Sequence, residues 1–421
     1  MIKIINCNKK NYLNVLTKFL DLRRSEKKNE NKIISKILQD IKNNKNKSLL
    51  KYEKKFSKNS QIKPGIKQIN KAIKSLDPTI KRAIDFAYKR ILKFHTAQKT
   101  KDIFYKDNLN NKIEYKYVPI QSIGIYVPAN LPSTLLMNAI PAKIAGVKRI
   151  VLANPKNNGK LNPAVLYAAK KLGINEIYSM GGAQAIGSLA YIQKVNKIVG
   201  PGNIFVAGAK RQVFGDVGIE GMIAGPSEIT ILADSKTNLN EVTTSMIGQA
   251  EHDSNSQCIL ITKNSDLINK FKKDLELKLK DLPRKNIASK SIKSNGLILK
   301  VYNDRQIIDA INEIAPEHLE INVGNYKKYK DKIVNAGSIC IGKYSPMALS
   351  DYAVGTNHVL PTNASAKFSS GLSLSEFYKK ISLITLSKKG VEKIGEYATH
   401  LAEYEELKGH ALSIKSRINK E

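Results

Sequence analysis

Short apolar segments alternate with longer amphipathic ones along most of the chain, and this alternation constrains the fold more than any other feature. Strands that alternate with helices are typical of a parallel sheet with helices on both faces. From residue 113 onward, the expected strands of a first block are SIGIYVP, RIVLANP, INEIYSM and NKIVG, and its expected helices are LPSTLLMNAIPAKIAGV, PAVLYAAKKLG and AQAIGSLAYI.

A second block with the same alternation follows the segment AGPSE. Its expected strands are ITILAD, CILIT, GLILKV, LEINV and SICIG, with helices between them. We therefore predict an α/β fold with two Rossmann-like parallel-sheet domains, followed by a charged helical tail from about residue 373. Ligands bind beyond the carboxyl ends of the strands in such sheets, so we expect the functional residues there.

The first 110 residues read as helices with a lysine-rich solvated face. Within them, KNNKNKSLLKYEKKFSKNSQ is of such low complexity that no single structure is assigned to it.

The net charge of +34 invites a nucleic-acid interpretation, but the type of basic residue argues against it. Only nine of the 70 basic residues are arginine, the side chain best suited to phosphate and guanine. Lysine is spread along the chain together with asparagine, a pattern that A/T-rich codon usage explains. We expect no specific nucleic-acid partner; specific binding and a general attraction of anionic ligands stay open as alternatives.

From the sequence we expect neither a membrane span nor a secretory leader. No segment approaches the roughly 18 apolar residues that a spanning helix needs, and the first twenty residues lack an apolar stretch with a cleavage site. Three widely spaced cysteines (Cys7, Cys258, Cys340) give neither a disulfide framework nor a CxxC metal pattern. A cytoplasmic location is expected.

Two glycine turns follow predicted strands and open predicted helices. These are MGGAQAIG (180–187) and VGPGNIF (199–205). Free backbone N–H groups at a helix start can receive a phosphate, but neither turn has the G-x-G-x-x-G fingerprint. Each is by itself a tight turn rather than a nucleotide cradle, and their adjacency favours a site between them.

Histidine is scarce, and four of the six histidines have a carboxylate or an amide nearby. Gln249 precedes His252 by three residues in QAEH, which places both on one face of a helix. His318 follows Glu317 in APEHLEI, His358 lies in SDYAVGTNHVLPT, and His410 lies in EYEELKGH. His95 and His400 have no such company and are interpreted as structural.

Imidazole and carboxylate groups in this number suit a zinc site, because zinc takes nitrogen and oxygen ligands in open, mostly tetrahedral sites. A further histidine or glutamate could then serve as a base. Spacing alone favours Glu251 as a ligand beside His252, since glutamine is an uncommon zinc ligand. Residue types alone leave the choice between Glu251 and Gln249 open.

Several long motifs together resemble the histidinol dehydrogenase family. They are QAEHDSNSQ, GPGN with AKRQVFGDV, AGPSE, APEHLEI, SDYAVGTNHVLPT and ELKGH, in this order and at this spacing. The resemblance runs from about residue 120 to the end. It implies a homodimeric enzyme that oxidises L-histidinol through L-histidinal to L-histidine, with one zinc ion per subunit and two NAD⁺ consumed.

The resemblance also implies roles for individual residues. The zinc ligands are Gln249, His252, Asp351 and His410, which also contact the substrate, and the catalytic pair is Glu317 and His318. His318 deprotonates the alcohol, contacts the substrate and assists the second hydride step, and Glu317 activates water. Further substrate contacts are Ser227, His358 and Glu405, and coenzyme contacts are Tyr126, Gln184 and Asn203.

The family pattern further implies how the chain is divided. The expected parts are an N-terminal helical segment (1–24), a zinc and catalytic α/β domain (25–125 with 229–372), an NAD-binding α/β domain (126–228) and a dimerisation tail (373–421). The tail lends His410 to the neighbouring subunit by swapping. The chain departs from the family at YVPAN, where the loop is shortened and a glycine pair is missing.

Two other functions remain conceivable. The same residues could form a zinc hydrolase or lyase that uses no NAD, or the chain could be a degenerate, non-catalytic paralogue that only binds. Cys258 and Cys340 could be imagined as nucleophiles, but apolar flanking residues and the lack of a basic neighbour favour buried small hydrophobes.

Overall fold

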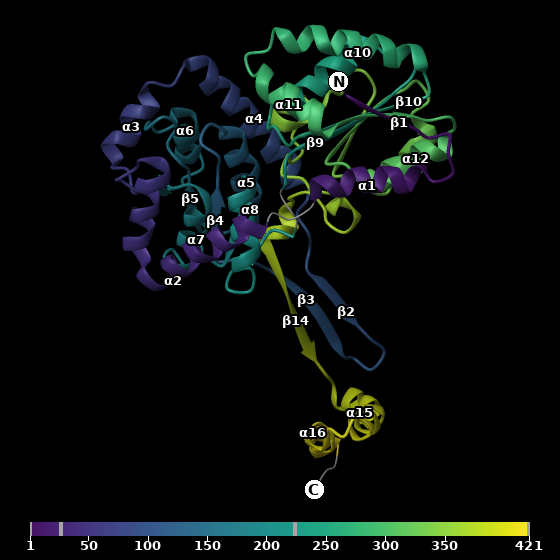
Figure 1. The fold of residues 1–421 in the computed structure, drawn as a ribbon. Helices are drawn as coiled ribbons and strands as arrows, with labels where there is room; N and C mark the ends of the chain where they lie inside the picture. Colours follow the sequence, from purple (N-terminus) through teal and green to yellow (C-terminus); the bar gives the residue numbers. More distant parts are fainter. Residues whose placement is uncertain (1, 25–27, 222–224, 419–421) are drawn as a thin grey trace.

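The protein consists of two α/β lobes and a protruding arm that ends in two helices (Figure 1). The computed structural model describes residues 2–24, 28–221 and 225–418. No helix among these residues is long and apolar enough to cross a membrane.

The first lobe is built on a parallel five-stranded sheet. Its strand order is β6 (Glu176–Tyr178), β5 (Arg149–Ala153), β4 (Ser122–Tyr126), β7 (Lys197–Val199) and β8 (Gly218–Ile219). The helices that follow its strands are α5 (Pro132–Ala145), α6 (Pro163–Lys171), α7 (Gly182–Tyr191) and α8 (Ile204–Val213). Every strand and helix predicted for this block is present. After β4, the chain forms β5 and β6 on one side of it and then crosses over to form β7 and β8 on the other side. The strand order therefore reverses beside β4.

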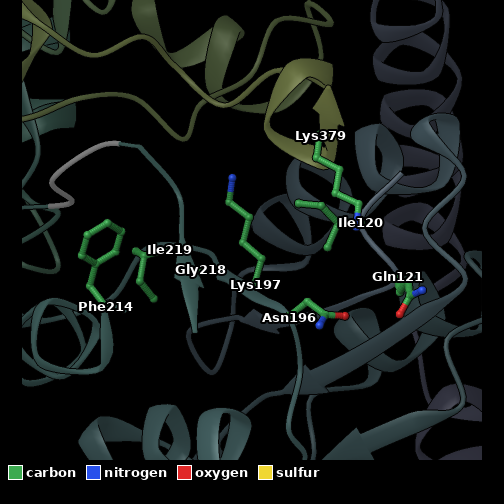
Figure 2. A pocket seen from close by; sticks show the side chains of 8 residues that line it. All are labelled: Ile120, Gln121, Asn196, Lys197, Phe214, Gly218, Ile219 and Lys379. Atoms are coloured by element: carbon green, nitrogen blue, oxygen red, sulfur yellow. The ribbon is translucent and has the colours of Figure 1, made fainter. Parts of the chain in front are cut away.

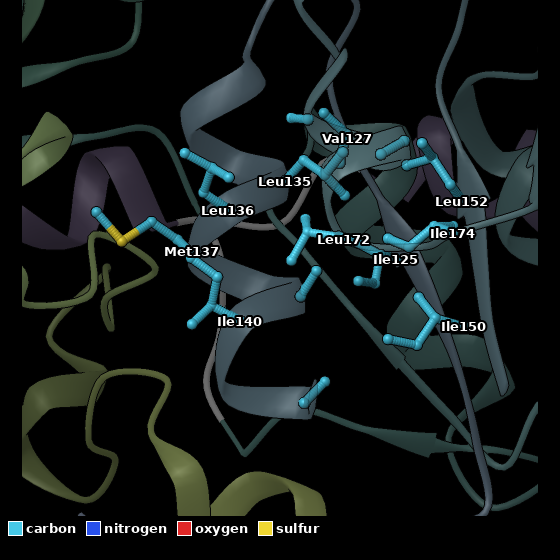
Figure 3. Packing of buried hydrophobic residues seen from close by; sticks show 14 of the residues in the cluster. Ile125, Val127, Leu135, Leu136, Met137, Ile140, Ile150, Leu152, Leu172 and Ile174 are labelled. Carbon is cyan, nitrogen blue, oxygen red and sulfur yellow. The ribbon is translucent and has the colours of Figure 1, made fainter. Parts of the chain in front are cut away.

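Buried aliphatic side chains join this sheet to α5. Figure 3 shows Leu135 and Ile140 of α5 against Ile125 of β4 and Leu152 of β5. The run LLMNAIPAKIA is apolar apart from Asn138 and the exposed Lys143, because α5 is covered both by the sheet and by neighbouring helices. This packing fixes the direction of β4, whose carboxyl end carries one of the predicted coenzyme residues.

The N-terminal helices cover the first lobe. They are α2 (Lys28–Ser57), α3 (Ile66–Lys74) and α4 (Pro78–Thr96). Ile34 and Ile41 of α2 pack with Ile186 of α7, and α4 packs on α5. The sequence-based division groups residues 25–125 with 229–372, whereas this packing joins residues 28–96 to the five-stranded sheet. Lysine bias had hidden the apolar face that decides where these helices dock.

The second lobe is built on a parallel six-stranded sheet. Its strand order is β1 (Lys3–Asn6), β11 (Gly296–Lys300), β10 (Gln257–Thr262), β9 (Glu228–Ala233), β12 (His318–Asn322) and β13 (Ser338–Ile341). One face carries α1 (Tyr12–Arg24) and α12 (Asp304–Ile314), and the other α9 (Leu239–Ala250), α10 (Ser265–Lys280) and α11 (Lys285–Asn295). The N-terminal segment predicted as helical therefore begins with an edge strand, because KIIN can pair with β11.

The arm is an antiparallel sheet of three strands. They are β2 (Ile103–Lys106), β3 (Lys112–Pro119) and β14 (Tyr378–Thr385), in the order β14-β3-β2. Beyond the arm, α15 (Lys388–Tyr404) and α16 (Lys408–Ile418) pack on each other, far from both lobes (Figure 1). In the tail predicted as helical from residue 373, the short 3-10 helix Leu374–Phe377 is therefore followed by a strand, and YKKISLIT is rich in the β-branched and aromatic residues that favour strands.

Candidate active site

The predicted catalytic residues lie at the amino edge of the six-stranded sheet. His318 is the first residue of β12, and Ser227 directly precedes β9. In the sheet, β9 lies between β10 and β12, and the backbone N–H of Gln257 at the start of β10 donates to Ser227 O at 2.9 Å. In this sheet, these predicted residues therefore lie at the starts of the strands and not beyond their carboxyl ends.

His318 is surrounded by carboxylates from two elements. Its Nε2 lies 3.6 Å from Asp351 Oδ1 and 3.9 Å from Glu317 Oε1, both beyond hydrogen-bond distance. Asp351 comes from the short helix α14 (Met347–Tyr352), which packs on α9 and β12. The side chains of Glu317 and His318 are 8% and 4% exposed, so a substrate held here would be screened from water.

His358 joins the cluster from the loop after α14. Its Nδ1 lies 2.8 Å from the carbonyl oxygen of Asp351, and its Nε2 lies 3.2 Å from Thr134 Oγ1 on α5. The imidazole therefore bridges the two lobes. A hydrogen on Nδ1 satisfies the carbonyl and leaves Nε2 as an acceptor on the side of the first lobe.

Burial keeps the histidines of the cluster neutral. It lowers the pKa of His318 to about 3 and that of His358 to about 4, with smaller contributions from neighbouring histidines. Dense packing also lowers the pKa of His252, although this residue stays open to solvent on one side. Neutral imidazoles can accept a proton or bind a metal ion, so both predicted roles are chemically available.

The two carboxyl groups shift in the opposite direction. Burial raises the pKa of Asp351 to about 7. Burial, followed by the charges of Glu228 and Asp351, raises the pKa of Glu317 well above its usual range, against the lowering effect of a hydrogen bond from the backbone of Glu228. A carboxylate with a raised pKa is a stronger base, which is the property needed to activate water.

The predicted metal ligands of the main body fit a divalent cation. Gln249, at the end of α9, is 1% exposed, and its amide nitrogen has no hydrogen-bond partner among the described residues. The amide oxygen and nitrogen can exchange places by a flip, so the carbonyl oxygen can face the same space. With the exposed His252 and the partly buried Asp351, this gives one nitrogen and two oxygen donors of the kinds that zinc takes.

The two tail residues of the prediction are not part of this cluster. Glu405 directly follows α15 and His410 lies on α16; both are exposed, at the far end of the arm (Figure 1). Within residues 2–24, 28–221 and 225–418, no group of three histidine, cysteine, aspartate or glutamate side chains could hold a metal ion. The single chain therefore provides only Gln249, His252 and Asp351 of the predicted ligand set.

The predicted coenzyme residues lie at the carboxyl edge of the five-stranded sheet. Tyr126 ends β4, Gln184 lies in the first turn of α7, and Asn203 caps α8. The strand order reverses beside β4, and ligands bind at such a switch point in open parallel sheets. Asn154 Nδ2 donates to the carbonyls of Val127 and Pro128, which fastens the shortened loop after β4.

A buried carboxylate already occupies the start of α7. Glu53 Oε1 accepts hydrogen bonds from Gly181 N at 2.8 Å and Gln184 Nε2 at 2.9 Å. Gly182 N donates to Tyr126 Oη at 3.4 Å. The MGGAQAIG turn is therefore a capped tight turn, in which the anion is supplied by α2 rather than by a phosphate.

The second glycine turn is equally well fastened. Asn203 Oδ1 accepts from Phe205 N and Val206 N, and the buried Lys210 donates to Gly200 O while pairing with Glu220. Gly200 has a φ of +107°, and a Cβ there would lie 2.1 Å from the carbonyl oxygen of Tyr126. Only glycine allows the turn to approach β4 this closely.

The cysteines near the site remain protonated thiols. Burial raises the pKa of Cys258 to about 12 and that of Cys340 to about 11. Cys258 is fully buried in β10, whereas Cys340 is half-buried in β13. Neither is suited to nucleophilic catalysis, because the thiolate is the reactive form.

A shallow pocket of about 370 Å³ lies at the opposite, amino edge of the five-stranded sheet. Figure 2 shows Lys197 and Lys379 on its walls. It contains none of the predicted site residues, and Lys197 Nζ is paired with Glu376 at 2.6 Å. We therefore assign no role in the chemistry to it.

Sequence reasoning missed three polar residues in contact with the predicted ones: Glu228, whose N–H donates to Glu317, Arg23, which pairs with Glu228, and Glu53, which accepts from Gln184. Glu228 ends the quoted motif AGPSE and could have been singled out. Arg23 and Glu53 lie in the biased N-terminal region, where neither spacing nor composition distinguishes them from the surrounding charged residues.

Comparison with known proteins gives a consistent result. The family model described as histidinol dehydrogenase matches residues 21–418. The chain is 56% identical to a histidinol dehydrogenase of Pelagibacter ubique over 427 residues, with 100% of both chains covered, and 46% identical to histidinol dehydrogenase 1 of a Nostoc species, with 80% of each covered. The crystal structure of histidinol dehydrogenase from Elizabethkingia anophelis superposes with a TM-score of 0.92 at 36% identity, covering 99% of this chain and 98% of that one.

Proposed function

Because the chain belongs to the histidinol dehydrogenase family, we propose that it oxidises L-histidinol through L-histidinal to L-histidine, the last step of histidine biosynthesis, and reduces two NAD⁺. The observation that carries this proposal is the buried cluster of His318, Glu317 and Asp351 at the amino edge of the six-stranded sheet. A neutral imidazole beside two carboxyl groups suits a reaction with two successive proton transfers.

Two bound groups complete the proposed site. One zinc ion per subunit, held by Gln249, His252, Asp351 and His410, would hold the amine and imidazole nitrogens of the substrate, and NAD⁺ would accept the hydrides. The buried side-chain amide of Gln249 has no hydrogen-bond partner for its nitrogen within the described ranges. After a flip of the amide, its carbonyl oxygen would lie at this position and could bind the ion. Glu251, which spacing alone favoured, is not needed in this set.

His318 acts first in the proposed sequence. Its Nε2 makes no hydrogen bond to either neighbouring carboxylate, so it is available to receive the hydroxyl proton of the alcohol. The low exposure of His318 keeps bulk water away while the aldehyde forms. His318 then also assists the second oxidation, as the resemblance implies.

Glu317 acts on the aldehyde. Its Oε1 faces His318, and its raised pKa makes it able to take a proton from a water molecule that attacks the aldehyde carbon. The resulting hydrate carries the second C–H bond, whose hydrogen leaves as hydride. This order assigns the two proton transfers to two residues with different chemistry.

The remaining contacts are proposed from the same resemblance. Tyr126, Gln184 and Asn203 would contact the coenzyme from the block 126–228, which the switch point beside β4 supports. Ser227, His358 and Glu405 would contact the substrate. The contacts of His358 with Asp351 O and Thr134 Oγ1, which hold its imidazole beside the cluster, support this proposal.

We also propose a homodimer in which each tail completes the other subunit's site. The arm and tail support this, because their apolar side chains are uncovered in the single chain: Tyr397, Leu401 and Tyr404 of α15 are 70%, 63% and 88% exposed. A second copy of the chain would cover them and bring Glu405 and His410 to the cluster. We further propose a cytoplasmic location, which fits three unpaired cysteines.

The reaction is tested by following NADH and histidine together in the purified protein. We expect about two NADH for each histidinol consumed, with histidine as the product, and loss of turnover after treatment with a zinc chelator. Hydrolysis or elimination without NADH would support the zinc hydrolase or lyase instead. Binding without any turnover would support a degenerate paralogue; none of the reported relatives favours either alternative.

The shared tail is tested by mixing two inactive variants. His318→Asn leaves the tail intact, and His410→Asn leaves the main body intact. If the tails are exchanged, coexpressed mixed dimers regain about half of the activity of the wild-type protein, because one of the two sites is complete. No recovered activity in verified mixed dimers would contradict tail sharing.

A further inference from the structure

Glu317 is held by a reciprocal pair of hydrogen bonds with Glu228. The backbone N–H of Glu228 donates to Glu317 Oε2 at 2.7 Å, and the backbone N–H of Glu317 donates to Glu228 Oε2 at 3.3 Å. β9 and β12 are neighbours in the sheet, so both residues lie at adjacent strand starts. The side-chain carboxylate of Glu228 thereby fixes the backbone of Glu317, and that of Glu317 fixes the backbone of Glu228.

Arg23 holds the outer oxygen of Glu228. The guanidinium forms a salt bridge with Glu228 Oε1 and donates to the carbonyl of Pro226, and its Nε donates to the carbonyl of Asn255 at 3.0 Å. The side chains of Arg23 and Glu228 are 7% and 3% exposed. The backbone N–H of Asn363 donates to the same Glu228 oxygen at 2.9 Å. The rigid fork of arginine thus connects α1 to the segment that carries Ser227.

These bonds distinguish the two oxygens of the Glu317 carboxylate. Oε2 is occupied by the backbone of Glu228, whereas Oε1 is directed at His318, 3.9 Å from its Nε2. A carboxyl group with two free oxygens could rotate about its last bond. The bond to Oε2 removes this freedom and directs one defined oxygen into the cluster.

A buried ion pair is weak evidence for a purely stabilising role. Removing two charges from water costs several kcal/mol per ion, and a well-packed apolar pair of similar size is often as stable. Orientation of a catalytic group is a better account, since a displacement of about 1 Å near the reacting atoms can cost two orders of magnitude in rate.

We propose that Arg23 and Glu228 are positioning residues for Glu317, which aim its Oε1 at the water that attacks the aldehyde. This inference rests on the proposed function. In the step concerned, the water oxygen bonds to the aldehyde carbon, its proton passes to Glu317 Oε1, and the C=O π electrons move to the aldehyde oxygen. The hydrate anion formed in this way then transfers its hydride to NAD⁺ as the C=O bond forms again, which gives the carboxylic acid and NADH. Alcohol oxidation adds no water, so it depends less on the pair.

The test compares two reactions of the same substrate, histidinal. With NAD⁺ the protein oxidises histidinal to histidine, which requires water activation; with NADH it reduces histidinal to histidinol, which does not. Both rates are read at 340 nm with opposite sign. The variants are Glu228→Gln, which keeps the shape of the side chain, and Arg23→Met, which keeps its aliphatic length. Arg23→Lys restores a charge, and Arg149→Met is the control, because it breaks another arginine–glutamate pair outside the cluster.

We expect kcat for histidinal oxidation to fall by about tenfold or more in Glu228→Gln and Arg23→Met, and kcat for histidinal reduction to stay within about threefold. Arg23→Lys recovers part of the oxidation rate, and Arg149→Met changes neither rate. Equal losses in both directions would overturn the proposal and leave a general structural role. Unchanged oxidation would also overturn it. If Arg23→Met does not fold, Glu228→Gln decides alone.

Failure of this inference is distinguishable from failure of the proposed function. A wild-type protein that neither reduces NAD⁺ with histidinol nor oxidises histidinal would contradict the function itself. A wild-type protein active in both directions, with variants that lose both equally, would contradict only the role of Arg23 and Glu228.

Discussion

The carboxyl edge of the five-stranded sheet and the amino edge of the six-stranded sheet differ in how their buried polar groups are satisfied. At the first, Gly181 N and Gln184 Nε2 both donate to Glu53, and Asn203 caps its own helix. At the second, Gln249 Nε2 and His318 Nδ1 are buried without a partner among the described residues. Glu53 Oε2 and Ser179 Oγ at the first edge also lack a partner in the described part of the chain, so the two edges differ in which groups are unpartnered: at the second edge these belong to a predicted metal ligand and to the predicted base.

The unpartnered buried groups indicate where a ligand can gain binding energy. A buried polar group without a hydrogen bond costs about 1–3 kcal/mol, so the catalytic edge is less stable without its ligands. A group that fills it recovers this cost on binding. At the coenzyme edge, Gly181 N is already bonded to Glu53, and Phe205 N and Val206 N to Asn203, so mutations there should act through the shape of the turns.

The largest effect is expected from the catalytic pair. Glu317→Gln and His318→Asn should each lower kcat for histidinol oxidation by about 10²–10⁴-fold, because each removes a proton acceptor. NADH affinity should stay within about twofold, since the coenzyme residues lie on the other sheet. Fluorescence titration measures the NADH affinity, and a steady-state assay measures kcat. Variants with wild-type turnover would contradict the assignment of catalysis to the six-stranded sheet.

A smaller effect is expected from the turn at Gly200. In Gly200→Ala, the new Cβ would meet the carbonyl oxygen of Tyr126, and the backbone would have to keep a φ of +107°. We expect a loss of roughly 3 kcal/mol in the free energy of unfolding and a KM for NAD⁺ raised about tenfold. Urea unfolding measures the change in the free energy of unfolding, and NAD⁺ saturation curves measure the change in KM.

The matched control is Gly159→Ala. Gly159 also has a positive φ (+76°), but a Cβ there would meet nothing within 4 Å. It should cost only about 1 kcal/mol from backbone strain and leave the KM for NAD⁺ unchanged. Equal effects of the two substitutions would show that close approach to β4 is not what the turn requires.

Glu53 should affect the coenzyme edge alone. Glu53→Ala frees the amide of Gln184 to rotate, so we expect the KM for NAD⁺ to rise about fivefold, with kcat at saturation and zinc content unchanged. In the double variant with Gln184→Ala, the two effects should not add, because Glu53 acts through that amide. Full additivity, or a change confined to stability, would contradict this assignment.

The smallest effect concerns pH and the link between the lobes. His95 on α4 donates from Nδ1 to Ile91 O, and Asn357, next to His358, donates to its Nε2. Burial lowers the pKa of His95, so below about pH 6.5 the unfolded chain binds a proton that the folded one excludes. Stability should therefore decrease as the pH falls from 7 to 5.

The His95 contribution is isolated by comparing slopes. His95→Gln should flatten the pH dependence of the urea midpoint by at most one proton, or about 1.4 kcal/mol per pH unit. The control His400→Gln changes an exposed histidine and should leave the slope as in the wild type. Identical slopes for all three proteins would show that His95 is not held neutral.

Much of the fold could be predicted from the sequence. Apolar runs such as CILIT and GLILK report burial directly. The helix expected before CILIT is present as α9, but it ends at Ala250, so His252 lies in the turn beyond it and not on the same helix face as Gln249. The packing of residues 28–96 could not be predicted, because lysine and asparagine obscure the apolar face of α2. The strand β14 was missed because a charged composition resembles that of the helices after it.

The candidate site was only partly predictable. The residues of the cluster were found through their motifs, but their place at the amino edge of the sheet depends on how β9, β10 and β12 are ordered in space. The contributions of Arg23 and Glu53 depend on contacts across 205 and 131 positions of the chain. Local patterns carry no information on such distant partners.

We propose that the coenzyme and the catalytic residues meet between the carboxyl edge of the five-stranded sheet and the amino edge of the six-stranded sheet, with a metal ion at Gln249, His252 and Asp351. The most direct measurement is a crystal structure of Glu317→Gln with histidinol and NAD⁺, with data collected at the zinc absorption edge. The account predicts one zinc peak per subunit at these side chains and a nicotinamide ring that reaches from Tyr126 towards His318. A zinc peak elsewhere, or NAD⁺ bound at the carboxyl edge of the six-stranded sheet beside Asp234, would contradict it.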